Sequence, residues 1–377
     1  MSFNLLRNAR VFFTTNVNAG TGVIQATGFT TSNAFEIQVL DDLSFSQNTS
    51  SETVTLTEGG AVPVRGQRSF NTALEPADVS FTTYMRPADG GTNITAEESV
   101  LWNALFAVDA IGGSSPAWSE DTTHATCVAT NSQVHQLQKF GLIVVLDSAT
   151  YAIDNCALDT ATIDFGLDAI ASIQWGAKAA RLRDLGTVTA TTGGTVTFGG
   201  ALTGSAKGKN TTAPYIANKL TTLTVTEGIN GTGTAYTVPI TGGSITISNN
   251  ITYLTPANLG VVNKPFTYFT GTRSISGSLN AYLRTGATNT AGLLADMLTS
   301  SDSDVDPAFY IEVQVGGAAN ATRVELEMPA AVLSIPTVSS EQVFSTTINF
   351  TAQGEDTGAF DLEEANELEV RYYTTNA

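Results

Sequence analysis

The sequence predicts a mainly β fold with a small helical part, arranged as two similar halves. Only 14% of the residues are Asp, Glu, Lys or Arg, where soluble domains usually have about a quarter. Thr, Ser, Asn and Gly take their place, and these residues suit strands and tight turns. Apolar residues recur with the two-residue period of strands, and several such stretches occur twice in the same order.

The charge balance is acidic: 35 acidic residues face 17 basic ones, and the formal net charge is -18. Solubility is the simple interpretation of such a balance. A sharper one is a surface that repels nucleic acid, because a nucleic-acid binder needs clustered Lys and Arg. The densest basic cluster is "RLR" (Arg181 to Arg183), which is too small for such a binding surface.

Neither a signal peptide nor a membrane span is predicted. The apolar stretches around Arg7 and Arg10 are too short for the core of a signal peptide, and the longest apolar run, Gly141 to Leu146, is too short to cross a bilayer. Cys127 and Cys156 leave either one bridge or two buried thiols, and a reducing cytosol favours the thiols. We expect a soluble protein that is made in the cytosol.

The first half opens with residues 1–34, which are polar with short apolar islands and are expected to form an N-terminal arm. Residues 35–47 alternate like strands, and Asp41 and Asp42 interrupt the alternation. A further strand places Val79, Phe81 and Thr83 on one face and ends in Tyr84-Met85-Arg86.

The best helix of the sequence is expected over residues 95–110. Thr95 is its expected N-cap, Glu97 and Glu98 lie in the expected first turn, and apolar residues recur at helical spacing after them. A long polar loop follows. Residues 140–179 then supply two or three strands.

Residues 186–218 are rich in Gly and Thr and are expected to form a linker or small insertion between two domains. The first domain is expected at 35–185. The second is expected at 219–377 and includes a C-terminal arm.

Five elements of the first half recur in the second half in the same order. The paired segments are 43–48 with 245–250, 79–86 with 277–284, the helix around Trp102 with 289–298, 140–146 with 309–315, and 156–178 with 331–353. The last pair places Leu158 on Leu333 and Trp175 on Phe350. The ordered series indicates a duplicated unit, although each match alone is weak.

The stretches "FEIQVLDDLSFSQ", "ALEPADVSFTTYMRP", "ATIDFGLDAIASIQWGAKA" and "AVLSIPTVSSEQVFSTTINFTAQGE" carry a resemblance to a known family. Their order resembles that of the tail tube proteins of long-tailed bacteriophages. With their connections these stretches cover most of 35–185 and 240–355. The resemblance implies two tandem tail-tube-like β-sandwich or barrel domains, each with one flanking helix.

The resemblance also implies a structural function in the virion, and the sequence itself predicts neither catalysis nor a cofactor. Three copies of a duplicated chain are expected to form a trimeric, pseudo-hexameric ring, and stacked rings are expected to form the tail tube for genome ejection. The implied partners are other copies of the chain, a tape-measure protein, a baseplate or tip initiator and a tail terminator, while phage DNA passes through unbound. The implied location is the virion tail, after assembly in the bacterial cytoplasm.

An acidic channel wall suits such a function, because it repels phosphates. The acidic residues within or beside strand patterns are the candidates for the channel surface; an ordinary solvated outer face is the alternative for each. They are Asp41, Asp42, Asp164, Asp168, Glu312, Glu325 and Glu327.

Metal and catalytic sites are not predicted. His124, Cys127, His135 and Cys156 lack the spacing of a zinc site. The run "DSDVDP" (Asp302 to Pro307) begins like a calcium loop but lacks the required Gly and Glu. The alternative to a tail tube is a β-rich phage surface, receptor-binding or capsid decoration protein with two tandem sandwiches.

Overall fold

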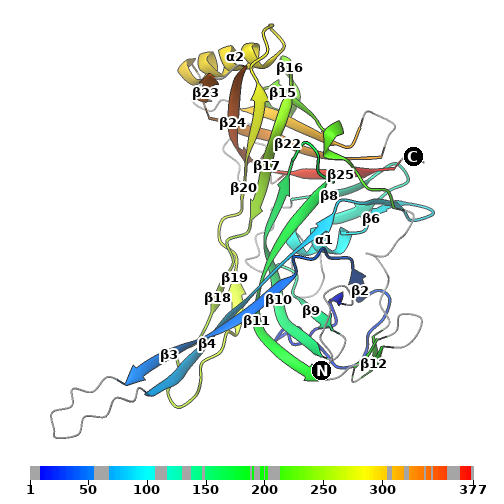
Figure 1. Ribbon diagram of the computed structural model, residues 1–377, viewed down its shortest axis with the longest axis vertical. Helices are drawn as coiled ribbons and strands as arrows, with labels where there is room; N and C mark the ends of the chain where they lie inside the picture. Colours follow the sequence, from blue (N-terminus) through cyan, green and yellow to red (C-terminus); the bar gives the residue numbers. More distant parts are fainter. Residues whose placement is uncertain are drawn as a thin grey trace, which may run out of the picture.

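The computed structural model describes residues 9–54, 68–106, 117–129, 137–146, 149–186, 189–190, 196–198, 200–202, 213–303, 308–317, 322–334, 337–340, 343–354 and 366–374. Strands dominate these residues, and the two helices are short (Figure 1). The predicted mainly β fold class with minor α is therefore confirmed. None of the helices in these ranges is long and apolar enough to cross a membrane.

Among the described residues, the first half has eleven strands and one helix. They are β1 (Arg10–Thr14), β2 (Ala34–Ile37), β3 (Ser44–Val54), β4 (Arg68–Tyr84), β5 (Pro87–Asp89), β6 (Ile94–Ala96), α1 (Ser99–Phe106), β7 (Trp118–Glu120), β8 (Ala125–Val128), β9 (Phe140–Val145), β10 (Thr150–Asp164) and β11 (Ser172–Gly186).

A small separate sheet and the elements of the second half follow. They are β12 (Thr189–Ala190), β13 (Val196–Phe198), β14 (Gly200–Leu202), β15 (Thr222–Glu227), β16 (Ala235–Val238), β17 (Ile240–Ser248), β18 (Thr252–Leu254), β19 (Thr267–Phe269), β20 (Ser274–Tyr282), α2 (Thr290–Ser303), β21 (Phe309–Val315), β22 (Arg323–Leu333), β23 (Thr337–Ser340), β24 (Phe344–Gln353) and β25 (Glu369–Tyr373). Two short 3₁₀ turns lie at Asn218–Leu220 and Ile229–Gly231.

One continuous sheet joins the two halves, and we call it the central sheet. Its strand order is β3, β4, β11, β10, β17, β20, β24, and then the end of β22 together with β23. The halves meet where β10 pairs antiparallel with β17. These pairings place four strand positions of each half in a single eight-stranded layer, and Figure 1 shows how the strands of the two halves follow one another.

Each half adds a second layer over the central sheet. In the first half this outer sheet is β2, β1, β9 and the start of β10. In the second half it is β16, β15, β21 and the start of β22. The long strands β10 and β22 run through both layers, as expected for strands that turn the corner of a sandwich.

The space between the layers is filled by one hydrophobic cluster that extends through both halves. In β4 the side chains of Val79, Phe81 and Thr83 are buried and the residues between them are not, which is the predicted two-residue period. Trp175 of β11 packs edge-on against Trp102 of α1, with ring centroids 5.3 Å apart. The buried faces of these two elements thus meet in the core.

The two halves share one pattern of neighbours across the central sheet. In the first half one row of neighbouring residues runs Phe45, Val79, Ala177, Leu158. The equivalent row of the second half runs Ile245, Gly277, Phe350, Leu333. The large ring of Phe350 lies where the first half has Ala177, and its neighbour Gly277 leaves room for it: a Cβ there would lie 2.6 Å from the Phe350 ring.

Two boundaries differ from the sequence prediction. Residues 10–14, expected within an N-terminal arm, form β1 between β2 and β9, with Val11, Phe12 and Phe13 buried. The helix begins at Ser99, while Thr95 lies in β6 and its hydroxyl donates to Glu120. The predicted N-cap at Thr95 is therefore wrong, because this residue pairs with Ala88 of β5.

The second helix was expected, whereas a paired strand lies where a C-terminal arm was expected. Helix α2 covers the expected segment 289–298 almost entirely. Strand β25 lies between β22 and β8, and its Tyr372 is fully buried. Residues 369–373, expected within a C-terminal arm, therefore belong to a sheet.

Candidate functional site: the open face of the central sheet

The face of the central sheet that points away from the core carries hydroxyl, amide and glycine positions. These positions alternate with the buried ones along each strand, and they are half-buried or exposed. They include Ser44, Ser46, Ser80, Thr82, Gln174, Gly176, Thr160, Thr162, Ser244, Thr246, Ser276, Ser278, Asn280, Thr347, Asn349 and Thr351. We call this surface the open face.

Hydroxyl and amide groups meet across neighbouring strands of the open face. Ser44 and Ser80 lie with their hydroxyl oxygens 2.9 Å apart, and Thr347 donates to Asn280 at 2.8 Å. At the junction of the two halves, the hydroxyl oxygens of Thr162 and Thr246 are 3.4 Å apart. The polar surface therefore continues across the junction without a break.

Charges are few on the open face. Among the described positions of the central sheet that alternate with buried ones, the charged residues are Asp78, Asp164 and Lys178. Lys178 forms an ion pair with Asp159 at 3.0 Å and donates to the carbonyl of Ile251 at 2.9 Å. The positive charge is thus paired within the chain, and the face leaves little to attract a phosphate.

Four of the predicted acidic residues lie at or near this face. Asp164 is exposed at the end of β10, opposite Ser244. Asp42 is exposed before β3 and accepts hydrogen bonds from the amide and hydroxyl of Thr82. Asp41 is its exposed neighbour, and Asp168 is exposed in the turn between β10 and β11.

The other three predicted acidic residues lie together on the outer sheet of the second half. Glu312 of β21 lies directly opposite Glu327 of β22. Glu325 forms an ion pair with Arg323 at 2.7 Å, and Glu327 pairs with Arg371. Burial raises the pKa of Glu327 to about 6. Glu312, Glu325 and Glu327 therefore form a paired charge network away from the central sheet.

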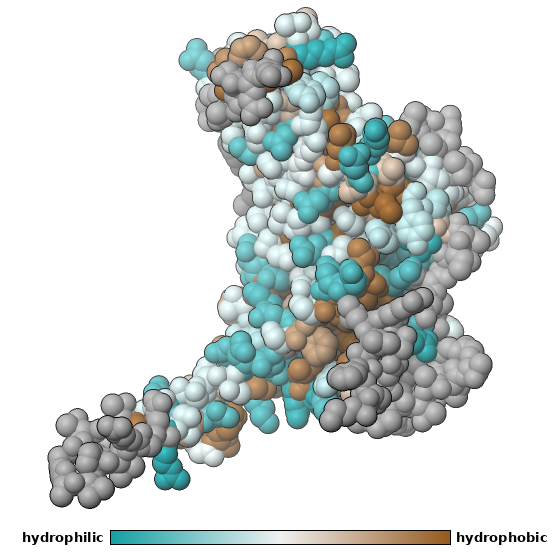
Figure 2. Space-filling view, in the orientation of Figure 1, coloured by the Kyte–Doolittle hydropathy of each residue, from teal (hydrophilic) through white to brown (hydrophobic). Residues whose placement is uncertain are grey.

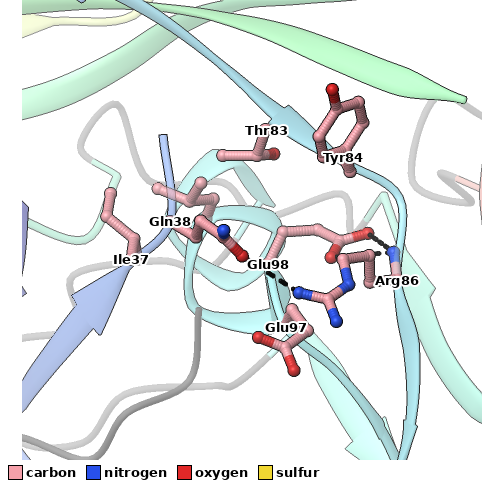
Figure 3. Close-up of a pocket in the computed structure, with 8 residues that line it drawn as sticks. Ile37, Gln38, Thr83, Tyr84, Arg86, Glu97 and Glu98 are labelled. Atoms are coloured by element: carbon pink, nitrogen blue, oxygen red, sulfur yellow. Dashed lines mark hydrogen bonds between the residues drawn. The ribbon is translucent and has the colours of Figure 1, made fainter. Parts of the chain in front are cut away.

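A buried polar network beside α1 was not predicted, and Figure 3 shows the part of it around Glu98 and Arg86. Glu98 accepts a hydrogen bond from the Tyr372 hydroxyl at 2.5 Å and from the Arg86 amide at 3.3 Å. The indole of Trp102 donates to the same Tyr372 hydroxyl at 2.7 Å. Burial raises the pKa of Glu98 to about 7. The network ties β25 to α1 and to the end of β4.

The cavity lined by this network is too small for a substrate. Its volume is about 10 Å³, which is the space of one water molecule. The guanidinium of Arg86 donates to Gln38 at 3.0 Å and to the carbonyl of Ala213 at 2.7 Å, and it lies 4.4 Å from the ring centre of Tyr215. These contacts fix the arginine in a structural position.

The two cysteines are buried thiols without a bridge. The thiol of Cys156 donates to the carbonyl of Ile153 at 3.2 Å, and burial raises the pKa of both thiols well above the ordinary value. The described residues hold no cluster of three or more metal-ligating side chains. His135 and residues 304–307 of the acidic run lie outside the described residues.

Comparison with known proteins agrees with the architecture. No protein-family model matches the sequence. The chain is 32% identical over 379 residues to the tail tube protein pb6 of Escherichia phage T5, and the match covers 96% of this chain and 75% of that protein. An identity of this size over almost the whole chain shows common descent. The chain therefore belongs to the phage tail tube proteins, which are structural proteins of the virion tail.

Proposed function

We propose that three copies of this chain close into a pseudo-hexameric ring, and that stacked rings form the tube through which the phage genome passes into the host. The observation that carries the proposal is the arrangement of the two halves. They share one pattern of neighbouring residues across their strands, and they lie side by side in one central sheet. In a ring of three such chains, one half packs beside the next half in the same way six times. Closed rings of this kind use heterologous interfaces.

The proposal treats the chain as two copies of one unit. Both halves have the strand order of a two-layer sandwich, with a helix placed before the strands β9 or β21. The unit then extends from β1 to β11 in the first half and from β15 to β24 in the second, and the Gly- and Thr-rich residues 186–218 connect them. Because β1 belongs to the first unit, this unit begins before residue 35, the start predicted from the sequence.

The size of the resulting barrel fits a channel. Three copies of eight strands give 24 strands. At a spacing of about 4.8 Å, these strands enclose a ring roughly 37 Å across between backbones, and strand tilt widens it further. Barrels with fewer strands already leave an aqueous channel.

The chemistry of the open face suits the passage of DNA. Hydroxyl and amide groups offer weak and exchangeable hydrogen bonds, while firm binding of a duplex needs unpaired Lys or Arg. Lys178 is held by Asp159, and the exposed Asp164 adds a repelling charge. We propose that Asp41, Asp42 and Asp168 lie at the rims of the channel, and that Glu312, Glu325 and Glu327 lie on the outside of the tube.

The remaining partners follow from the same proposal. A tape-measure protein would lie inside the tube during assembly, a tip complex would start it and a terminator would end it. Assembly would take place in the bacterial cytoplasm. No residue of the chain is assigned a catalytic role.

Negative-stain electron microscopy of the purified protein over a range of concentrations tests the proposal. We expect rings with a central channel, or tubes, to form as the concentration rises. Addition of the tip complex covers the case in which assembly needs an initiator. Two-lobed single chains at every concentration, with and without the tip complex, would contradict it.

A further inference from the structure

The central sheet has two edges that are paired on one side only among the described residues. Residues 44–47 of β3 pair with β4, and β23 pairs with β24. Open strand edges expose unpaired amide and carbonyl groups and favour association. Because β3 and β23 are the first and eighth strands, seven spacings of about 4.8 Å separate them by roughly 34 Å along the sheet. The two edges of one chain therefore cannot pair with each other.

The junction inside the chain shows how two such edges fit. Strand β10 pairs antiparallel with β17, with Thr162 opposite Thr246 and Ile163 opposite Ile245. Main-chain hydrogen bonds continue the pairing at both ends, from Phe165 to Gly243 and from Asn249 to Asp159, each 2.8 Å long. Ile163 and Ile245 are both buried there.

The pattern of neighbouring residues that the two halves share identifies the counterparts of these residues at the open edges. Ile163 ends the row Thr83, Ile173, Ile163. The equivalent row of the second half is Ala281, Thr346, Val338, so Val338 is the counterpart of Ile163. On the other side, Phe45 is the counterpart of Ile245, because each begins an equivalent row.

The exposure of these counterparts shows that both edges lack a cover. Val338 is 41% exposed, whereas its counterpart Ile163 is 1% exposed. Phe45 is only half-buried, although Ile245 is completely buried. Beside β23, Phe344 is 53% exposed, and Figure 2 shows hydrophobic residues at the end of the molecule that carries α2. Both edges thus expose apolar side chains whose counterparts are buried at the internal junction.

We propose that β23 of one copy pairs antiparallel with β3 of a second copy in the register of the internal junction. Thr337 then lies opposite Ser46 of the second copy, Val338 opposite its Phe45, and Ser339 opposite its Ser44. This pairing rests on the proposed ring and specifies its seam. Each seam buries Val338 and Phe45 and extends the hydroxyl surface of the open face from one chain to the next.

Cysteine crosslinking tests the register. Paired strands hold opposite Cα atoms about 4.5–5.5 Å apart, which lies within the range of disulfides. The double variant Thr337→Cys with Ser46→Cys is expected to give covalent oligomers that end at a closed trimer on a non-reducing gel after mild oxidation. Thr162→Cys with Thr246→Cys is the positive control, and it is expected to close inside one chain. The native cysteines are buried and should not compete.

A slipped register provides the matched negative control. Thr337→Cys with Ser44→Cys moves one partner by two residues on the same face of β3, and it is expected to crosslink at least tenfold more slowly. Equal or faster crosslinking of this slipped pair would overturn the register. Rings that are visible by electron microscopy but never crosslink through Thr337→Cys and Ser46→Cys would overturn the seam and leave the ring intact. An absence of rings in the unsubstituted protein would instead contradict the proposed function.

Discussion

Replacing Trp175 with alanine is expected to lower the free energy of unfolding by about 3–5 kcal/mol. The side chain is fully buried, its ring packs against Trp102, and its indole donates to the hydroxyl of Thr83 at 2.9 Å. Truncation removes the apolar contact and leaves a cavity. It also removes the indole N–H that donates a hydrogen bond to the buried hydroxyl of Thr83. Chemical denaturation of the unassembled protein measures the effect.

The neighbouring residue gives the control for this substitution. Gln174 is exposed on the open face of the same strand, so Gln174→Ala is expected to change the free energy of unfolding by less than about 0.5 kcal/mol. Similar losses for Trp175→Ala and Gln174→Ala would contradict the assignment of the two faces of β11. A loss confined to Trp175→Ala supports it.

The second large effect is a pH dependence that Glu98→Gln should remove. Burial raises the pKa of Glu98 from 4.5 to about 7, so the folded state holds its proton more tightly than the unfolded state does. Below pH 4.5 both states are protonated and the group contributes no pH dependence. Stability then falls as the pH rises to about 7, by about 3 kcal/mol in total, and the loss remains above that pH.

Urea denaturation at pH 5 and pH 8 measures this effect. The unsubstituted protein should lose stability between the two values, and Glu98→Gln should lose markedly less. Glu327, whose pKa burial raises to about 6, adds a smaller change of the same sign, and Glu327→Gln measures it separately. An unchanged pH dependence in Glu98→Gln would show that Glu98 is ionised in the folded protein.

The sequence predicted the faces of the strands better than their register. The two-residue period placed Val79, Phe81 and Thr83 on the core side, where the structure has them. The alignment of the two halves matched Trp175 with Phe350. In the structure, however, Trp175 lies opposite Phe81, and Ile348 lies opposite Leu279, the counterpart of Phe81. The counterpart of Trp175 is therefore Ile348. A shift of two residues keeps every side chain on its face, so alternation alone cannot detect it.

Long-range contacts explain what the sequence could not show. Glu98 and Tyr372 are 274 residues apart, and no local pattern links them. Glu98 was assigned to a helical first turn because acidic residues favour that position. The structure instead places its side chain in a buried network before α1, which begins at Ser99. The repeat of 79–86 in 277–284 included Arg86, but it did not identify the partners of this arginine.

The acidic candidates show the same limit. Each of them lies in or beside a strand, as predicted, but a strand pattern does not reveal which of two layers the strand enters. Glu312 and Glu327 face each other on the outer sheet, while Asp164 lies on the central sheet. Only the pairing of strands separates these two groups.

The number of copies in one ring tests the central claim most directly. Cryo-electron microscopy of end-on rings, with the mass of one ring measured by native mass spectrometry, gives this number. We predict three copies, true threefold symmetry and an outline that resembles a sixfold ring. Six copies in a ring with true sixfold symmetry would contradict the proposal that each chain supplies two of the six units.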